Sequence, residues 1–237
     1  MISRLDVINE VLGVEILSQS LLPAIANLAI DGKWRVRLAI IEHIPLLLNQ
    51  MSVAFFGEKF TDMCLSWLTD SVYAVRCAAV ENLKLLHNHL GETWTLTFVI
   101  PRLETLTSHK NYLFRLTGLH TIQVLCRCLS IPNIEKQLIP RVFHLVKDPV
   151  PNVRMKCSSA LVCLLKTLPA TSSYRKIIVE NLSELSADSD RDVKAAALQV
   201  MNCLLILACV TICANRASRT PDCKFWMIHL IACDEYV

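Results

Sequence analysis

The feature that most constrains this sequence is a repeat of about 39 residues that runs through most of its length. An apolar residue followed by a basic one recurs in five units, three times at an interval of 39 residues and once at 40. The five pairs are Val36-Arg37, Val75-Arg76, Phe114-Arg115, Val153-Arg154 and Val193-Lys194. A fixed period of this length indicates supersecondary units that stack on one another.

Other positions keep the same register. Five residues before each apolar anchor stands an aspartate, replaced by histidine in the third unit: Asp31, Asp70, His109, Asp148 and Asp188. Eleven residues after the anchor stands a leucine in every unit: Leu47, Leu86, Leu125, Leu164 and Leu204. Apolar or small residues also follow at offsets of four and eight. Offsets of 0, 4, 8 and 11 share one face of an α-helix, so each unit is predicted to contain a helix with this face buried.

Each unit also has room for a first helix before the anchor. Pro23, Pro101 and Pro140 recur in these first helices and are expected to bend them, because proline removes a helical hydrogen bond. The predicted pairs are 18–30 with 34–49, 56–69 with 72–90, 94–107 with 111–128, 134–147 with 151–167, and 172–187 with 190–208. The aspartates fall in the turns, where they are expected to accept amide hydrogens at the start of the second helix.

One helix pair cannot bury its own apolar face, so stacked pairs are predicted: an all-α fold, an α-solenoid of about five HEAT repeats. The period of 39 differs from the 34-residue tetratricopeptide and 33-residue ankyrin units. Residues 1–16 are predicted to be the remnant of a preceding repeat, 17–207 the five repeats, and 208–237 a divergent, apolar, cysteine-rich tail. Glycine is scarce, 5 of 237 residues, which disfavours a barrel, a sandwich or a glycine-rich phosphate loop.

Composition indicates which partners and which cellular compartment suit this chain. Hydrophobic residues make up 53% of the chain, enough for a core, and the net charge of +3 is far from that of a strongly basic nucleic-acid binder. Eleven cysteines, mostly within helical patterns, suit a reducing compartment, the cytosol or the nucleus. The apolar run at 203–214 is shorter than the about 20 residues needed to span a bilayer, so no membrane span is expected.

Signatures of catalysis are missing from the sequence. It contains no G-x-S-x-G, phosphate-binding loop or H-E-x-x-H motif, so neither an enzyme nor a cofactor is expected. Cys126 and Cys128 lack a second cysteine or histidine pair at zinc-like spacing, and Cys209 and Cys213 share only a helix face. No metal is therefore expected, although a metal or a disulfide at the last two stays an alternative.

Several stretches are more specific than the general repeat pattern: Leu17–Ile25, Lys33–Glu42, Trp67–Arg76, Asn111–Leu113 and Asp148–Arg154. They resemble one family of HEAT proteins, the scaffold A subunits of protein phosphatase type 2A, and the likeness covers roughly 2–207. The family scaffold has fifteen repeats, and this chain resembles the end of the tenth and the last five. The resemblance implies a non-catalytic fragment that binds the phosphatase catalytic subunit through the intra-repeat turns, with binding of regulatory B subunits weakened or lost.

By matching positions, the resemblance assigns contacts with the catalytic subunit to the first turns. They fall on Lys33, Trp34 and Arg35, on Tyr73 in the next turn, and on Asn111 and Tyr112 in the third. Trp, Tyr and Arg are favoured as interface anchors, because they bury much surface for few rotatable bonds. Packing of Trp34 between repeats is the alternative.

Three further alternatives remain open from the sequence. The basic column could be a ligand track, or it could form ion pairs with the turn aspartates of neighbouring repeats. The chain could be a HEAT adaptor for another protein cargo, or a degenerate, truncated paralogue without a stable fold.

The sequence also departs from the family pattern in two places. The tail at 208–237 matches no known pattern, and the third turn lacks the usual aspartate.

Overall fold

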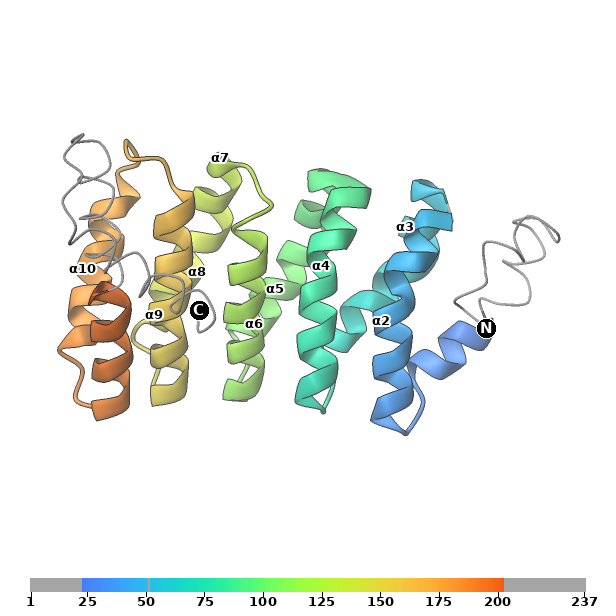
Figure 1. Ribbon diagram of the computed structural model, residues 1–237, viewed down its shortest axis with the longest axis horizontal. Helices are drawn as coiled ribbons and strands as arrows, with labels where there is room; N and C mark the ends of the chain where they lie inside the picture. Colours follow the sequence, from blue (N-terminus) through green and yellow to red (C-terminus); the bar gives the residue numbers. More distant parts are fainter. Residues whose placement is uncertain (1–22, 51, 203–237) are drawn as a thin grey trace, which may run out of the picture. The chain divides into compact units, whose positions relative to one another are not determined.

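A computed structural model describes residues 23–50 and 52–202 (Figure 1). Within these ranges all regular elements are helices, as predicted, and none is a strand. The chain divides into two compact units, Met1–Arg141 and Val142–Val237. The predicted remnant at 1–16 and the predicted tail at 208–237 lie outside the described residues.

The first unit contains three antiparallel helix pairs and the beginning of a fourth. Their second helices are α2 (Trp34–Gln50), α4 (Tyr73–Trp94) and α6 (Tyr112–Leu125). The first helices, in chain order, are residues 23–29, α3 (Val53–Ser66) with the 3-10 turn η2 (Trp67–Thr69), η3 (Thr95–Val99) with α5 (Ile100–Thr107), and α7 (Ile131–Asn133) with η4 (Ile134–Leu138). These bounds agree with the predicted pairs to within a few residues.

The second unit continues the same pattern. Helix α8 (Ile139–Leu145) crosses the boundary between the units and is followed by α9 (Pro151–Thr167). Helix α10 (Tyr174–Ser186) then precedes a last helix that is described from residue 191 to residue 202.

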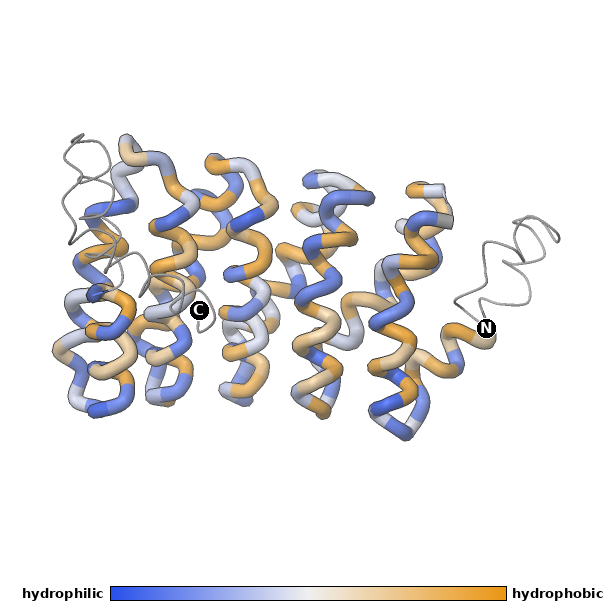
Figure 2. The backbone as a smooth tube through the Cα atoms, viewed as in Figure 1, coloured by the Kyte–Doolittle hydropathy of each residue, from blue (hydrophilic) through white to orange (hydrophobic). Residues whose placement is uncertain are grey.

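The leucine column predicted to be buried lies in the core. Leu47, Leu86, Leu125 and Leu164 are each no more than 1% exposed, and Leu204 lies outside the described residues. Hydrophobic and hydrophilic residues alternate along the helices, as amphipathic helices in stacked pairs require (Figure 2).

Two buried tryptophans join successive pairs in the first unit. The indole Nε1 of Trp67 donates to the carbonyl of Ala29 at 3.0 Å, and that of Trp94 donates to the Thr61 hydroxyl at 2.9 Å. Both side chains are almost fully buried, so each polar indole nitrogen needs the partner that it has.

Two prolines of the first helices lie beside a local irregularity of the helix. Pro101 and Pro140 each follow a π-helical turn, η3 and η4, in which the residue before proline donates its amide five residues back. A π turn widens the helix where proline can neither donate nor tolerate the usual carbonyl four residues earlier. The sequence predicted the bend, while the π turn was not foreseen. Helix α4 has its own irregularity at Gly91, where φ is 87°.

Candidate functional site

The turns between paired helices share a backbone framework built on the aspartate column. In the first unit, Asp31 Oδ1 accepts the Lys33 amide at 2.7 Å and Asp70 Oδ1 accepts the Val72 amide at 2.8 Å. In the second unit, Asp148 and Asp188 accept the amides two residues on at 2.9 and 2.8 Å. The predicted role of these carboxylates is confirmed, with one difference. The accepted amide belongs to the residue just before the second helix rather than to its first turn.

Two arginines of the basic column, Arg37 and Arg154, each connect a turn to the turn of the next repeat. Arg37 donates Nη1 to the Asp31 carbonyl at 2.7 Å, and its Nε and Nη2 to the two carboxylate oxygens of Asp70 at 2.7 and 2.8 Å. Arg154 repeats this bidentate arrangement with Asp188 at 2.8 and 2.9 Å in the second unit. At these two positions the predicted inter-repeat ion pair is confirmed, and the arginine is not free to form a ligand track.

The ion pairs also change the acidity of the aspartates. Burial by itself would raise the pKa of Asp70, but hydrogen bonds from Arg37 and the Val72 amide outweigh it and lower the pKa below its ordinary value. Hydrogen bonding from Arg154 is the largest cause that lowers the pKa of Asp188. Both carboxylates are therefore charged at neutral pH.

The third turn keeps the backbone contact of the framework without its charge. His109 stands in place of aspartate, and its Nδ1 accepts the Asn111 amide at 3.0 Å. This contact requires the hydrogen of a neutral ring to be on Nε2. Asn111 adds an N-cap bond, because its Oδ1 accepts the Leu113 amide at 3.0 Å.

Arg76 consequently lacks the carboxylate partner that Arg37 and Arg154 have. It is 3% exposed and donates Nε to the Thr117 hydroxyl at 3.1 Å and Nη1 to the Asp70 carbonyl at 2.8 Å. Its guanidinium carbon lies 5.7 Å from the ring centre of Tyr73 and 5.6 Å from that of Phe114. Cation–π contacts and neutral acceptors thus replace the ion pair between the second and third repeats.

The residues assigned by resemblance all lie at the turn ends of the first unit. Lys33, Arg35 and Asn111 are exposed, whereas Trp34 is half-buried. Tyr73 is 70% and Tyr112 36% exposed. The Arg35 guanidinium lies 4.4 Å from the centre of the Trp34 ring, so this pair stacks at the surface.

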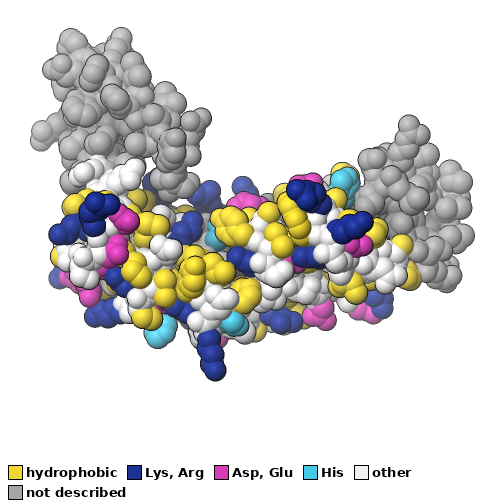
Figure 3. Space-filling model, turned by 90° about the horizontal axis from the view of Figure 1, so that it is seen from below, with side chains coloured by type: hydrophobic (Ala, Val, Ile, Leu, Met, Phe, Trp, Pro, Cys, Tyr) yellow, Lys and Arg dark blue, Asp and Glu magenta, His cyan; other side chains and the backbone are white. Residues whose placement is uncertain are grey.

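The structure shows a regularity among these residues that was not predicted from the sequence. Trp34, Tyr73 and Tyr112 are the first residues of α2, α4 and α6, so the same helical position carries an aromatic ring in three successive repeats. Their spacing of 39 residues was the available signal. Lys110, exposed in the third turn, was also missed. Figure 3 looks onto the side where these turns lie and shows hydrophobic side chains interspersed with Lys and Arg.

Hydrogen bonding with the Cys77 thiol, one helical turn further on, is the largest cause that raises the pKa of Tyr73. The phenol is therefore neutral at physiological pH and presents a hydroxyl beside an exposed ring. A neutral aromatic ring with a polar tip is suited to a protein interface.

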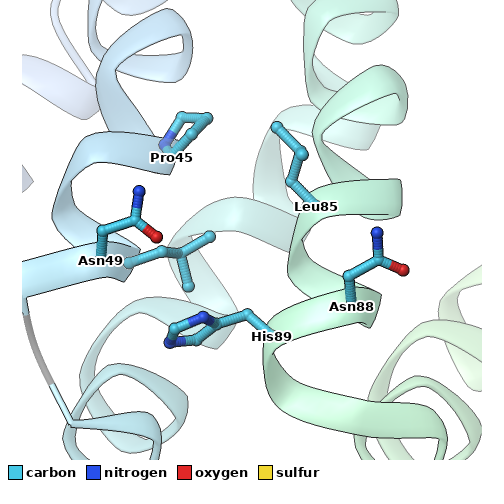
Figure 4. Close-up of a pocket in the computed structure, with 6 residues that line it drawn as sticks. Pro45, Asn49, Leu85, Asn88 and His89 are labelled. Carbon is cyan, nitrogen blue, oxygen red and sulfur yellow. The ribbon is translucent and has the colours of Figure 1, made fainter.

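A separate cavity of about 220 Å³ lies between α2 and α4, away from the turns (Figure 4). Pro45, Leu48, Asn49, Leu85, Asn88 and His89 line it. The buried Nε2 of His89 has no hydrogen-bond partner among the residues the structure describes. His89 is the cavity's one titratable lining residue, so the cavity has no acid/base pair.

Metal chemistry and membrane insertion find no support in the described part of the chain. Across 23–50 and 52–202, His, Cys, Asp and Glu side chains nowhere gather in a group of three that could hold an ion. Cys126 is buried and Cys128 half-buried, and neither forms a disulfide with another described cysteine. Burial raises the pKa of the Cys64 thiol to about 12, as expected for a cysteine that acts as a small apolar side chain. None of the described helices has the length and hydrophobicity of a membrane span.

Comparisons with known proteins agree with this architecture. Residues 60–90 and 138–168 match the HEAT repeat family. A 72-residue stretch, 30% of this chain, is 44% identical to the regulatory A subunit of protein phosphatase PP2A from Schizosaccharomyces pombe. A 118-residue stretch, 47% of this chain, is 40% identical to the Saccharomyces cerevisiae protein of the same name. The chain contains HEAT repeats and is homologous, over these stretches, to the PP2A regulatory A subunits. The resemblance found in the sequence is thereby confirmed.

A more distant relative widens the group. Human serine/threonine-protein phosphatase 4 regulatory subunit 1 is 24% identical over 171 residues, which are 68% of this chain. The matches span 12%, 19% and 18% of the fission-yeast, budding-yeast and human proteins. All three relatives are named as regulatory subunits, and this HEAT-repeat chain corresponds to a minor part of each.

Proposed function

We propose that this chain is a non-catalytic scaffold that binds the catalytic subunit of a type 2A protein phosphatase through its first three intra-repeat turns. The observation that carries the proposal is the aromatic column at the starts of three successive second helices, in which Tyr73 and Tyr112 are exposed and Trp34 is half-buried. Homology to the PP2A regulatory A subunits supports the choice of partner.

The framework beneath these rings suits them to binding. Hydrogen bonds at Asp31 and Asp70 fix the two turns, and Arg37 joins them through both oxygens of the Asp70 carboxylate. Side chains on a rigid turn lose little conformational freedom on binding, so more of their contact energy appears as affinity. A scaffold of this kind acts by holding the catalytic subunit near other bound proteins and raising its effective concentration there.

The proposal has two further parts, one from the family resemblance and one from the cysteines. The chain resembles the last five of fifteen repeats, so it is proposed to bind the catalytic subunit while its binding to regulatory B subunits is weakened or absent. It is proposed to be in the cytosol or the nucleus, since the described cysteines form no disulfide with one another.

The test is direct binding between the full chain and purified PP2A catalytic subunit. Trp34→Ala combined with Tyr73→Ala should weaken binding about 100-fold, since two interface anchors are lost. Phe98→Ala is the matched control, because Phe98 is a 44% exposed aromatic of the same unit that lies outside the turns. Circular dichroism should show all variants folded.

Other outcomes would redirect the proposal. Binding by the wild-type chain that survives the double substitution would remove the aromatic column from the interface. A wild-type chain that binds only phosphatase 4 catalytic subunit would transfer the scaffold role to the partner suggested by the human relative. Failure to bind either subunit would favour the adaptor for another cargo, and absence of a cooperative unfolding transition would favour the degenerate paralogue.

A further inference from the structure

We infer that the docking surface of the first unit selects an acidic protein partner. On that partner, carboxylates are expected to surround the depressions into which the aromatic rings of this chain insert. The surface is a basic-aromatic strip made of Lys33, Trp34, Arg35, Tyr73, Lys110 and Tyr112. The inference rests on the proposed function and adds the chemistry of the partner's contact surface.

The cations of the strip are not neutralised within the protein. Lys33, Arg35 and Lys110 are exposed and form no ion pair with any residue in the described ranges. The neighbouring carboxylates are already engaged, because Asp70 is bidentate to Arg37 and Asp31 accepts the amide of its own turn. The strip therefore presents three cations and no free carboxylate of its own.

Each cation lies beside an aromatic ring in the chain. Lys33 and Arg35 flank Trp34, with Arg35 stacked on the indole, and Lys110 precedes Tyr112 by two residues. Interfaces with this arrangement use the rings for buried contact area and the charges for orientation and partner choice. The complementary surface has apolar depressions rimmed by aspartate or glutamate.

A nucleic acid fits the strip less well than an acidic protein. Three free cations would release few counterions from a phosphate backbone, which limits affinity at physiological salt. A basic track is also not repeated along the turns. Asp190 and Asp192 of the fifth turn stand at the positions that Lys33 and Arg35 have in the first.

The first experiment measures binding of the full chain to purified PP2A catalytic subunit over a series of salt concentrations. Affinity should fall about tenfold or more between 50 and 300 mM NaCl, as expected for a charge-complementary interface. The triple variant Lys33→Glu, Arg35→Glu, Lys110→Glu should bind at least about tenfold more weakly at low salt and lose most of the salt dependence.

A matched variant separates local charge from net charge. Lys84→Glu, Arg102→Glu and Lys136→Glu also change exposed cations of the first unit, outside the turns, and both triple variants take the net charge from +3 to −3. Only the strip variant should lose binding. Equal losses in both variants, or salt-independent binding of the wild type, would overturn the inference and leave the proposed function intact.

A second experiment does not depend on the phosphatase. A fluorescent oligoglutamate peptide and a fluorescent single-stranded oligothymidine of equal charge are titrated with the full chain and with both triple variants. The inference expects the peptide to bind, and to lose binding in the strip variant but not in the control. Tighter binding of the oligonucleotide would overturn it in favour of a nucleic-acid partner, and so would failure of the peptide to bind. If the wild type does not bind the catalytic subunit, the proposed function fails and this experiment alone decides the charge preference.

Discussion

The first and fifth intra-repeat turns have the same backbone framework and opposite surface charge. In both, an aspartate Oδ1 accepts the amide two residues on, at 2.7 Å for Asp31 and 2.8 Å for Asp188. Where the second helix begins, however, the first turn has Lys33-Trp34-Arg35 and the fifth has Asp190-Arg191-Asp192. The comparison shows that folding determines the framework, while the residues beside it can change sign without altering the turn.

The largest expected effect comes from breaking the shared framework. Asp70→Ala removes both the acceptor of the Val72 amide and the partner of Arg37, whose side chain is only 12% exposed. Leaving a largely buried arginine unpaired should lower the free energy of unfolding by about 3 kcal/mol. Asp188→Ala should have a similar effect through Arg154. The free energy of unfolding of both variants can be measured by urea denaturation.

Asp62→Ala is the control for this prediction, because Asp62 is an exposed aspartate of the same unit that takes part in no ion pair or framework contact among the described residues. A loss at Asp70 no larger than at Asp62 would show that the turns do not depend on the framework.

Exchange of the surface residues is expected to affect binding rather than folding. Lys33→Asp, Trp34→Arg and Arg35→Asp give the first turn the surface of the fifth, and affinity for the catalytic subunit should fall about 100-fold. The free energy of unfolding should fall by no more than about 1 kcal/mol, since Lys33 and Arg35 are exposed and Trp34 is half-buried. The reverse change, Asp190→Lys with Asp192→Arg, should leave affinity nearly unchanged. If only the Asp190→Lys, Asp192→Arg variant lost binding, the docking surface would lie at the fifth turn instead of the first.

The third turn offers a smaller, stabilising change. His109→Asp would restore the carboxylate opposite Arg76, which now depends on Thr117 and two aromatic rings. An ion pair between Arg76 and a carboxylate, in place of contacts with uncharged acceptors, should raise the free energy of unfolding by about 1 kcal/mol. His109→Ala is the control, and it should destabilise because the Asn111 amide loses its acceptor. A destabilising His109→Asp would mean that Phe114 prevents the carboxylate from reaching Arg76.

The smallest expected effect is a dependence of the free energy of unfolding on pH, limited to acidic pH. The pKa values of Asp70 and Asp188 are lowered in the folded protein, so these groups add stability above the unfolded-state pKa of about 3.9. That contribution disappears as pH falls through the lower, folded-state values. Between pH 7 and 5 the two ion pairs should change stability little. Asp70→Asn with Asp188→Asn should flatten the acid limb of a stability–pH curve, and an unchanged limb would contradict the assigned shifts.

Much of the fold was predictable because its signals are local or strictly periodic. The leucine column is buried as its offset of eleven residues required, and the aspartates accept turn amides as their position indicated. The π turns before Pro101 and Pro140 were not predictable. A proline in the sequence shows that one helical hydrogen bond must be missing, but it does not specify whether the helix bends, ends or widens there.

The candidate site was only partly predictable. Its residues were identified by resemblance, and the structure shows them at equivalent turn ends with Tyr73 and Tyr112 exposed. The missing aspartate of the third turn was visible in the sequence. The replacement partners of Arg76 were not, because Thr117 lies 41 residues away and becomes a neighbour only through stacking.

The sequence by itself determined the helical pairs, their register and which face of each second helix is buried, because side chains spaced by three or four residues must share a helix face. The tertiary structure decided which charges are neutralised and which aromatic rings remain exposed. Arg37 and Arg35 stand two residues apart, yet one is bound to a carboxylate of the next repeat and the other stacks on an indole at the surface. The difference arises because ion pairing and exposure depend on what the neighbouring repeat places opposite each side chain, which no local pattern specifies.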